Sequence, residues 1–238
     1  MAATGTQPEN AAAQYQGWKL WWRWVGANAV AELIGLGGSA MVIIGMLTIV
    51  DGDSVSGALL VAAVSILLGT FFEGVMVGLL QWRVLRHPLP QLPRRDWILS
   101  TAAGAFVAWV LGMTPSTIMT FTADATAAAE TSSSWEPGTA VIMLMAAAMG
   151  LVGGIILGSP QWWVLRRHVG KAGWWIAANS LAWMAGMMLI FAGATNMPEG
   201  PITVGAVLLV VLSVLAAGTA VGAIHGAALV WLTRHKLQ

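Results

Sequence analysis

Six long apolar stretches limit what this chain can fold into. They cover about residues 25–50, 55–82, 97–121, 138–163, 174–194 and 203–232, with short polar segments between them. A helix needs about 20 apolar residues to cross the ~30 Å hydrocarbon core of a bilayer, and each stretch is long enough. The stretches are rich in Ala and Leu and lack a period-two alternation, which favours helices over barrel strands. We therefore expect an all-α integral membrane protein with six transmembrane helices.

Composition excludes the other broad classes. Only 9% of the 238 residues are charged and 58% are hydrophobic, whereas about 25% of the residues of a soluble domain are charged. Disorder needs the opposite balance, and a chain without cysteine has no disulfide scaffold. Residues 1–16 are small and polar without a signal-peptide pattern. We expect a disordered tail there, followed by one six-helix domain over residues 17–238.

The basic residues all fall on one side of this predicted topology. They are Lys19, Arg23, Arg83, Arg86, Arg94, Arg95, Arg166, Arg167, Lys171, Arg234 and Lys236. The three other connections carry only acidic charges, such as Asp51, Glu130 and Glu199. The positive-inside rule therefore predicts cytoplasmic N- and C-termini, in a bacterial inner membrane.

Most of the 14 tryptophans follow the same asymmetry. Those near the basic helix ends are Trp18, Trp21, Trp22, Trp24, Trp82, Trp97, Trp162, Trp163, Trp174, Trp175 and Trp231. An indole places its ring among acyl chains and its N–H among headgroups, so the pattern indicates an aromatic belt that anchors helix ends. A surface that stacks pigments or nucleobases is the alternative.

An internal repeat divides the chain into three helical hairpins, at about residues 17–86, 94–167 and 170–238. Residues 24–35 align without gaps on 175–186, and residues 108–112 match the end of that segment. Residues 81–86 (QWRVLR) align on 161–166 (QWWVLR). The third copy, aligned on Gly222 and Gly226, lacks the glutamine. Glycines spaced by four in these helices indicate close packing between helices of the same chain.

These motifs also carry a family resemblance. The boxes at 81–86 and 161–166, the opening WVGAN at 24–28 and the closing GAALVWL at 226–232 resemble a group of multi-pass bacterial membrane proteins of unknown function. The resemblance extends from about residue 18 over nearly the whole chain. It implies a membrane fold and brings no activity, substrate or catalytic residue with it.

Two acidic residues lie inside the predicted spans. Glu32 is eight residues from Trp24 and Glu73 is nine from Trp82, so at 1.5 Å per residue both lie about 12–14 Å from the cytoplasmic boundary. A carboxylate in hydrocarbon is costly, so each side chain is expected to keep its proton or to face a water-filled cavity. The pair predicts a proton or ion site. The alternative is a protonated carboxyl that only bonds neighbouring helices, contributing about 1 kcal/mol.

Other polar residues could complete this site. His225 aligns with Val77 and Leu157 and is a third candidate proton or ion ligand. Its alternatives are a core histidine with satisfied hydrogen bonds and an axial ligand of a pigment or haem. The supporting polar residues recur between copies, and they are Asn28, Asn179, Gln81 and Gln161.

The proline-containing loop at 85–96 and the matching helix end near 166 form a second candidate site. Its members are candidates for binding an anionic lipid headgroup, and they are Arg86, Arg94, Arg95, Arg166 and Arg167. The alternative is that these residues only set the topology.

Together these features favour a small-solute or ion transporter, or a channel-like protein, over an enzyme. The chain has no HExxH, CxxC or Walker motif and no distinct Ser/His/Asp set, so we expect no catalytic residue, metal or cofactor. The alternative is a non-catalytic accessory or structural subunit of a larger membrane complex, or of a homo-oligomer, that binds lipid or pigment. The net charge of +1 predicts no nucleic-acid partner.

Overall fold

The computed structural model describes residues 16–52, 54–126, 137–198 and 200–235, and every regular element in these ranges is a helix. The elements are α2 (Gly17–Leu47), α3 (Val55–Leu67), the π-helical turn η1 (Leu68–Gly74), α4 (Val75–Leu85), α5 (Arg94–Thr126), α6 (Thr139–Leu165), α7 (Trp174–Ala194) and α8 (Val204–Leu232). Since α3, η1 and α4 are continuous, the described residues form six helices long and apolar enough to cross a membrane. The predicted helical class and the number of helices long enough to cross a membrane are confirmed. The expected tail, apart from Gln16, lies outside the described residues.

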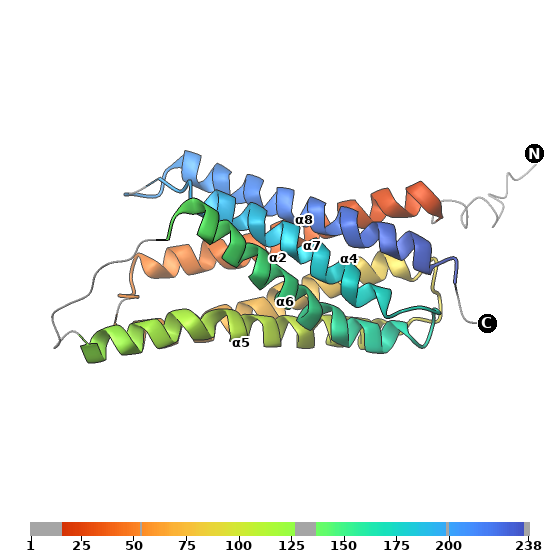
Figure 1. The fold of residues 1–238 in the computed structure, drawn as a ribbon, viewed down its shortest axis with the longest axis horizontal. Helices are drawn as coiled ribbons and strands as arrows, with labels where there is room; N and C mark the ends of the chain where they lie inside the picture. The colour runs from red at the N-terminus through yellow and green to blue at the C-terminus, as the bar shows by residue number, and fades with distance from the viewer. Residues whose placement is uncertain (1–15, 53, 127–136, 199, 236–238) are drawn as a thin grey trace, which may run out of the picture.

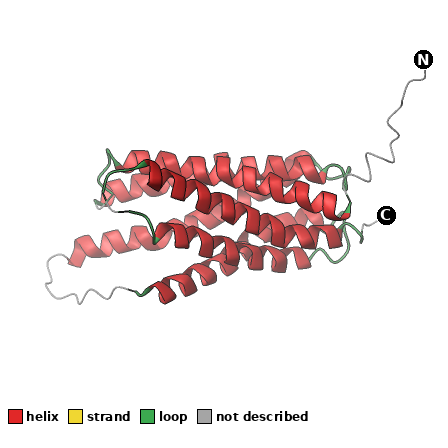
Figure 2. Cartoon of the chain, turned by 90° about the horizontal axis from the view of Figure 1, so that it is seen from above, coloured by secondary structure: helices red, strands yellow, loops and turns green. Residues whose placement is uncertain are grey.

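The long helices run alongside one another (Figures 1 and 2), and their contacts close them into a ring. Around this ring α2 packs on α8, α8 on α7, α7 on α6 and α6 on α5, and the helix made of α3, η1 and α4 packs on both α5 and α2. Helix α2 begins and α8 ends at the same end of the bundle (Figure 1). The described basic residues lie at this end too, which is called the basic end below.

Side-chain caps and a buried loop show how local sequence sets the helix ends. Ser54 accepts a hydrogen bond from the Gly57 amide at 3.1 Å at the start of α3, and Thr203 accepts one from Ala206 at 3.2 Å at the start of α8. Such caps satisfy amide groups that have no partner within the helix.

Between α4 and α5, Leu89 and Leu92 turn inward and are buried. This loop is therefore part of the core.

The main hydrophobic core lies at the basic end. Three of its members are Trp24, Trp97 and Trp175, each with no exposed surface. The ring centroids of Trp24 and Trp97 lie 5.9 and 6.1 Å from that of Trp175. The prediction that these three belong to an interfacial belt is wrong, because they pack on one another inside the ring. Trp18, Trp22, Trp163 and Trp174 are exposed, as a belt requires.

A glycine contact occurs three times around the ring, between α4 and α5, between α6 and α7, and between α8 and α2. The contacts pair Gly78 with Thr101, Gly158 with Asn179 and Gly222 with Asn28. In each pair, a Cβ atom added to the glycine would lie 3.0–3.2 Å from the Cβ of its partner. A Cβ atom at any of these glycines would press on its partner, so glycine permits the close approach that the spacing of these residues predicted.

These contacts correct the alignment of the third hairpin. Gly222, and not Gly226, makes the contact that Gly78 and Gly158 make. His225 therefore takes the position of Gln81 and Gln161, three residues after the glycine, and not that of Val77 and Leu157. The sequence alignment is wrong by one helical turn, because a helix rich in Gly, Ala and Val looks similar when shifted by four residues.

Candidate functional site

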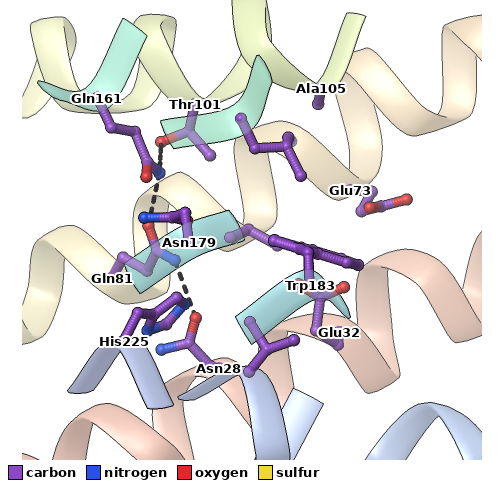
Figure 3. A pocket seen from close by; sticks show the side chains of 14 residues that line it. Asn28, Glu32, Glu73, Gln81, Thr101, Ala105, Gln161, Asn179, Trp183 and His225 are labelled. Atoms are coloured by element: carbon purple, nitrogen blue, oxygen red, sulfur yellow. Dashed lines mark hydrogen bonds between the residues drawn. The ribbon is translucent and has the colours of Figure 1, made fainter. Parts of the chain in front are cut away.

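A small cavity lined by both polar and apolar side chains lies inside the ring, and all six long helices contribute to its wall (Figure 3). Its volume is about 30 Å³. A single water needs at least about 10–15 Å³, so the cavity has room for about two. The predicted ion-site and supporting polar residues all line it, and they are Asn28, Glu32, Glu73, Gln81, Gln161, Asn179 and His225. The structure thus brings together residues that are far apart in the sequence.

The three buried tryptophans help to locate the wall of the cavity. The residues eight positions after Trp24, Trp97 and Trp175 all line it, and they are Glu32, Ala105 and Trp183. Ala105, and not Trp109, therefore occupies the position that corresponds to Glu32. The sequence alignment of this helix is also wrong by one turn. Only one of the three equivalent positions carries an acid.

A chain of buried amides crosses the ring beside the cavity (Figure 3). Gln81 Nε2 donates to Asn28 Oδ1 at 2.9 Å, and Gln161 Nε2 donates to Gln81 Oε1 at 3.1 Å and to Thr101 Oγ1 at 2.9 Å. Trp175 Nε1 donates to Gln161 Oε1 at 3.0 Å. The two glutamines bond each other in the interior. This network links five different helices.

His225 is a core histidine with a partner. Its Nδ1 accepts a hydrogen bond from Trp24 Nε1 at 2.7 Å, and its ring stacks on Trp175 with centroids 5.4 Å apart. An indole N–H only donates, so Nδ1 carries no proton and a neutral imidazole has its proton on Nε2. This supports the interpretation of His225 as a hydrogen-bonded core residue. Its position in the wall keeps it a candidate for the site.

Glu32 is a buried carboxyl group on the wall of the cavity. It is 2% exposed, and its Oε2 has no hydrogen-bond partner within the described residues. Gly218 of α8 lies against the Glu32 side chain. Among the described residues, neither lysine nor arginine lines the cavity. An unpaired buried carboxylate costs several kcal/mol, so the group must hold a proton or face a bound cation.

Glu73 reaches the cavity from the π-helical turn η1. Its Oε2 accepts a hydrogen bond from Trp109 Nε1 at 3.1 Å, and the Trp109 indole occupies space that a side chain at Gly69 would fill. A Cβ atom added to Gly35 of α2 would lie 2.8 Å from Glu73 Cα. Gly35 is three residues after Glu32, on the same helix face. Glu32 and Glu73 therefore face one cavity, and single π-helical turns are frequent at functional sites.

The five predicted lipid-binding arginines lie apart from this cavity, exposed at the basic end. Arg86 and Arg94 place their guanidinium carbons 5.5 and 5.6 Å from the centroid of Trp82. Arg166 lies 3.4 Å from the centroid of Trp163. These are cation–π distances.

Burial and nearby arginine charges lower the pKa of two histidines at the basic end. Burial and the charges of Arg86 and Arg23 hold the pKa of His87 below its ordinary value of 6.5. Burial and Arg167 lower the pKa of His168, although Asp96 opposes this shift. The nearby arginine charges thus add to the effect of burial on both pKa values.

No group of three or more His, Asp or Glu side chains within the described ranges is arranged to hold a metal ion. No protein-family model, curated protein or solved structure matches this chain. The cavity and its chemistry therefore carry the functional argument.

Sequence reasoning missed three side chains of the site. Thr101 and Trp183 line the cavity, and Trp109 holds Glu73. The signal for the first two was available, because Thr101 follows Trp97 by four residues and Trp183 follows Trp175 by eight, as Asn28 and Glu32 follow Trp24. No sequence signal pointed to Trp109 as the partner of Glu73, since the contact crosses between helices.

Proposed function

We propose that this protein is a small membrane transporter or channel-like protein in which Glu32 and Glu73 hold a transferable proton or small ion. One observation carries the proposal: Glu32 lines a cavity at the centre of a helix ring, and its Oε2 is buried without a hydrogen-bond partner in the described part of the chain. Ionisable residues inside membrane spans usually mark ion or proton pathways. The carboxyl of Glu73 in the same cavity gives a proton or ion a second position.

The proposed topology follows from the charges. The six spans form three tandem hairpins in a bacterial inner membrane, with the basic end and both termini in the cytoplasm. The chain has no cysteine, so single introduced cysteines test this directly. Gln91→Cys at the basic end should react with a membrane-impermeant maleimide only from the cytoplasmic side, and Gly52→Cys only from the opposite side. Labelling of both from one side would contradict the topology.

The function is tested in vesicles that contain the purified protein. Wild type should conduct protons or take up a small ion, and the double variant Glu32→Gln, Glu73→Gln should lose this activity while keeping the shape of both side chains. Asp96→Asn is the matched control, because it makes the same chemical change outside the cavity. Flux and uptake that are equal in wild type and the double variant would exclude this function.

Contacts between arginine and tryptophan side chains at the basic end support a second candidate function, that of an accessory subunit which binds lipid. Two arginines lie on Trp82 and one on Trp163, a combination suited to anionic headgroups. Purification in mild detergent followed by native mass spectrometry tests it. Retained anionic lipid or a co-purifying membrane subunit would favour this candidate, and a chain that migrates alone without lipid would exclude it.

A further inference from the structure

We propose that the central cavity binds a small, weakly hydrated monovalent cation of the size class of ammonium and potassium, and that Trp183 contributes to its selection. This inference rests on the proposed function, because it names the ion that the Glu32 and Glu73 site holds.

The charge of the wall selects a cation. Glu32 and Glu73 supply two carboxyl groups, and neither lysine nor arginine is among the described residues that line the cavity. His225 accepts a hydrogen bond from Trp24 at Nδ1. Its imidazole is therefore neutral and adds no positive charge to the wall. A positive guest would be attracted to the Glu32 carboxyl group, whose Oε2 has no hydrogen-bond partner within the described ranges. An anion would instead meet two acidic groups and no lysine or arginine among the described residues of a water-poor site.

The volume of the cavity limits the size of this cation. A space of about 30 Å³ accepts one guest of about the size of water, or two. Ammonium and potassium fit, whereas tetramethylammonium and larger organic cations do not. The site therefore selects an inorganic or ammonium-type ion and excludes most organic solutes.

The ligands of the wall argue against divalent ions. Calcium takes about six to eight oxygen ligands, and magnesium requires a nearly ideal octahedron. One oxygen of Glu73 already accepts from Trp109, and the oxygens of Gln81 and Gln161 accept from other side chains. The remaining oxygens, chiefly those of Glu32 and Asn179, are too few to replace the strongly held water of a divalent ion, whereas monovalent ions hold their water less tightly.

An aromatic side chain completes the wall. Trp183 reaches the cavity from α7, in the position that corresponds to Glu32 on α2 (Figure 3). Indole is the strongest of the aromatic side chains in attracting cations, and the attraction favours ions that give up their water readily. Carboxyl groups with an indole therefore favour ammonium and potassium over the more strongly hydrated sodium.

Thermal unfolding of the purified full chain in detergent tests this inference. Ammonium and potassium chloride should raise the unfolding temperature in a saturable way, because a ligand of the folded state stabilises it. Sodium chloride at the same ionic strength should do so less, and tetramethylammonium chloride should have no saturable effect. Glu32→Gln should weaken the apparent affinity by about tenfold or more, as expected for loss of a charged partner. Trp183→Leu should narrow the difference between potassium and sodium.

Loss of cation binding in Glu32→Gln could result from misfolding, so a second variant that keeps Glu32 and Glu73 is needed. Leu157→Phe should fill part of the cavity and remove the saturable effect, and Asp96→Asn should preserve it. A stabilisation that is equal for all four salts would overturn the inference. So would the absence of saturable stabilisation in a protein whose vesicle activity depends on Glu32 and Glu73, and that result would leave the proposed function standing. Vesicle activity that survives both Gln substitutions would instead remove the proposed function.

Discussion

Trp24 donates its indole N–H to Nδ1 of His225 across the contact between α2 and α8, at 2.7 Å. Trp175 makes the matching bond to Gln161 across the contact between α7 and α6, at 3.0 Å. The two acceptors occupy equivalent positions, each three residues after the glycine of its contact. His225 is thus a hydrogen-bond acceptor in the place where α6 carries Gln161.

Replacing His225 by glutamine should therefore be tolerated. The amide oxygen that His225→Gln introduces can accept from Trp24, so we expect a change in the free energy of unfolding of less than about 1 kcal/mol. His225→Leu leaves the Trp24 N–H without a partner and should cost about 1–3 kcal/mol. Reversible unfolding in detergent measures both. Equal loss in the two variants would mean that imidazole has a role beyond accepting this bond.

Two adjacent glycines of α6 should respond to alanine in opposite directions. A Cβ atom at Gly154 would overlap the backbone of α7 at Asn179 and Ser180, whereas one at Gly153 meets no atom within 4 Å. Gly154→Ala should destabilise the fold by about 1–3 kcal/mol or more, because the helices must separate. Gly153→Ala should be neutral or stabilise by up to about 1 kcal/mol, because alanine favours the helix. Unfolding curves that coincide for the two variants would contradict the close contact.

The amide chain should contribute to stability through Gln161. Gln161→Leu removes the acceptor of Trp175 and the donor to Gln81 and Thr101. We expect a cost of about 1–3 kcal/mol for each buried group left without a partner. Gln91→Leu is the matched control, because Gln91 is exposed and should change the free energy of unfolding by less than about 0.5 kcal/mol. A Gln161→Leu protein as stable as the control would show that the network is dispensable.

The two histidines at the basic end should titrate independently. Burial first, and then the charges of Arg86 and Arg23, lower the pKa of His87, so Arg86→Gln should raise that pKa toward 6.5. Arg167→Gln should raise the pKa of His168. Each substitution should leave the other histidine unchanged, which makes each variant the control for the other. NMR titration of the imidazole protons measures this, and a shift of both histidines in one variant would be inconsistent with local charge as the cause.

The sign of the pH effect follows from these lowered pKa values. A histidine with a lower pKa in the folded protein binds its proton more readily when unfolded. Stability should therefore be retained above pH 6.5 and decrease as the pH falls below that value. Arg86→Gln should reduce this decrease, and a steeper decrease would contradict the assignment.

The amino-acid sequence determined the helical class, the number of spans and the one-sided distribution of charge. Apolar length and composition control these properties because bilayer thickness requires about 20 residues per helix. The same reasoning selected Glu32 and Glu73, since a carboxyl group inside a span is rare enough to stand out. The polar residues that recur between hairpins, including Gln81 and Gln161, were found by comparison of the copies.

Only the tertiary structure decided how these helices meet. The sequence of an apolar helix rich in small residues looks similar when it is shifted by one turn. Sequence comparison therefore placed His225 and the counterpart of Glu32 in the wrong register. The glycine contacts fix the position of His225, because they show which glycine of α8 lies against the neighbouring helix. The cavity lining fixes the counterpart of Glu32, which is Ala105. Burial of Trp24, Trp97 and Trp175 likewise depended on the closure of the ring, since an indole near a helix end suits lipid or core equally until its neighbours are known.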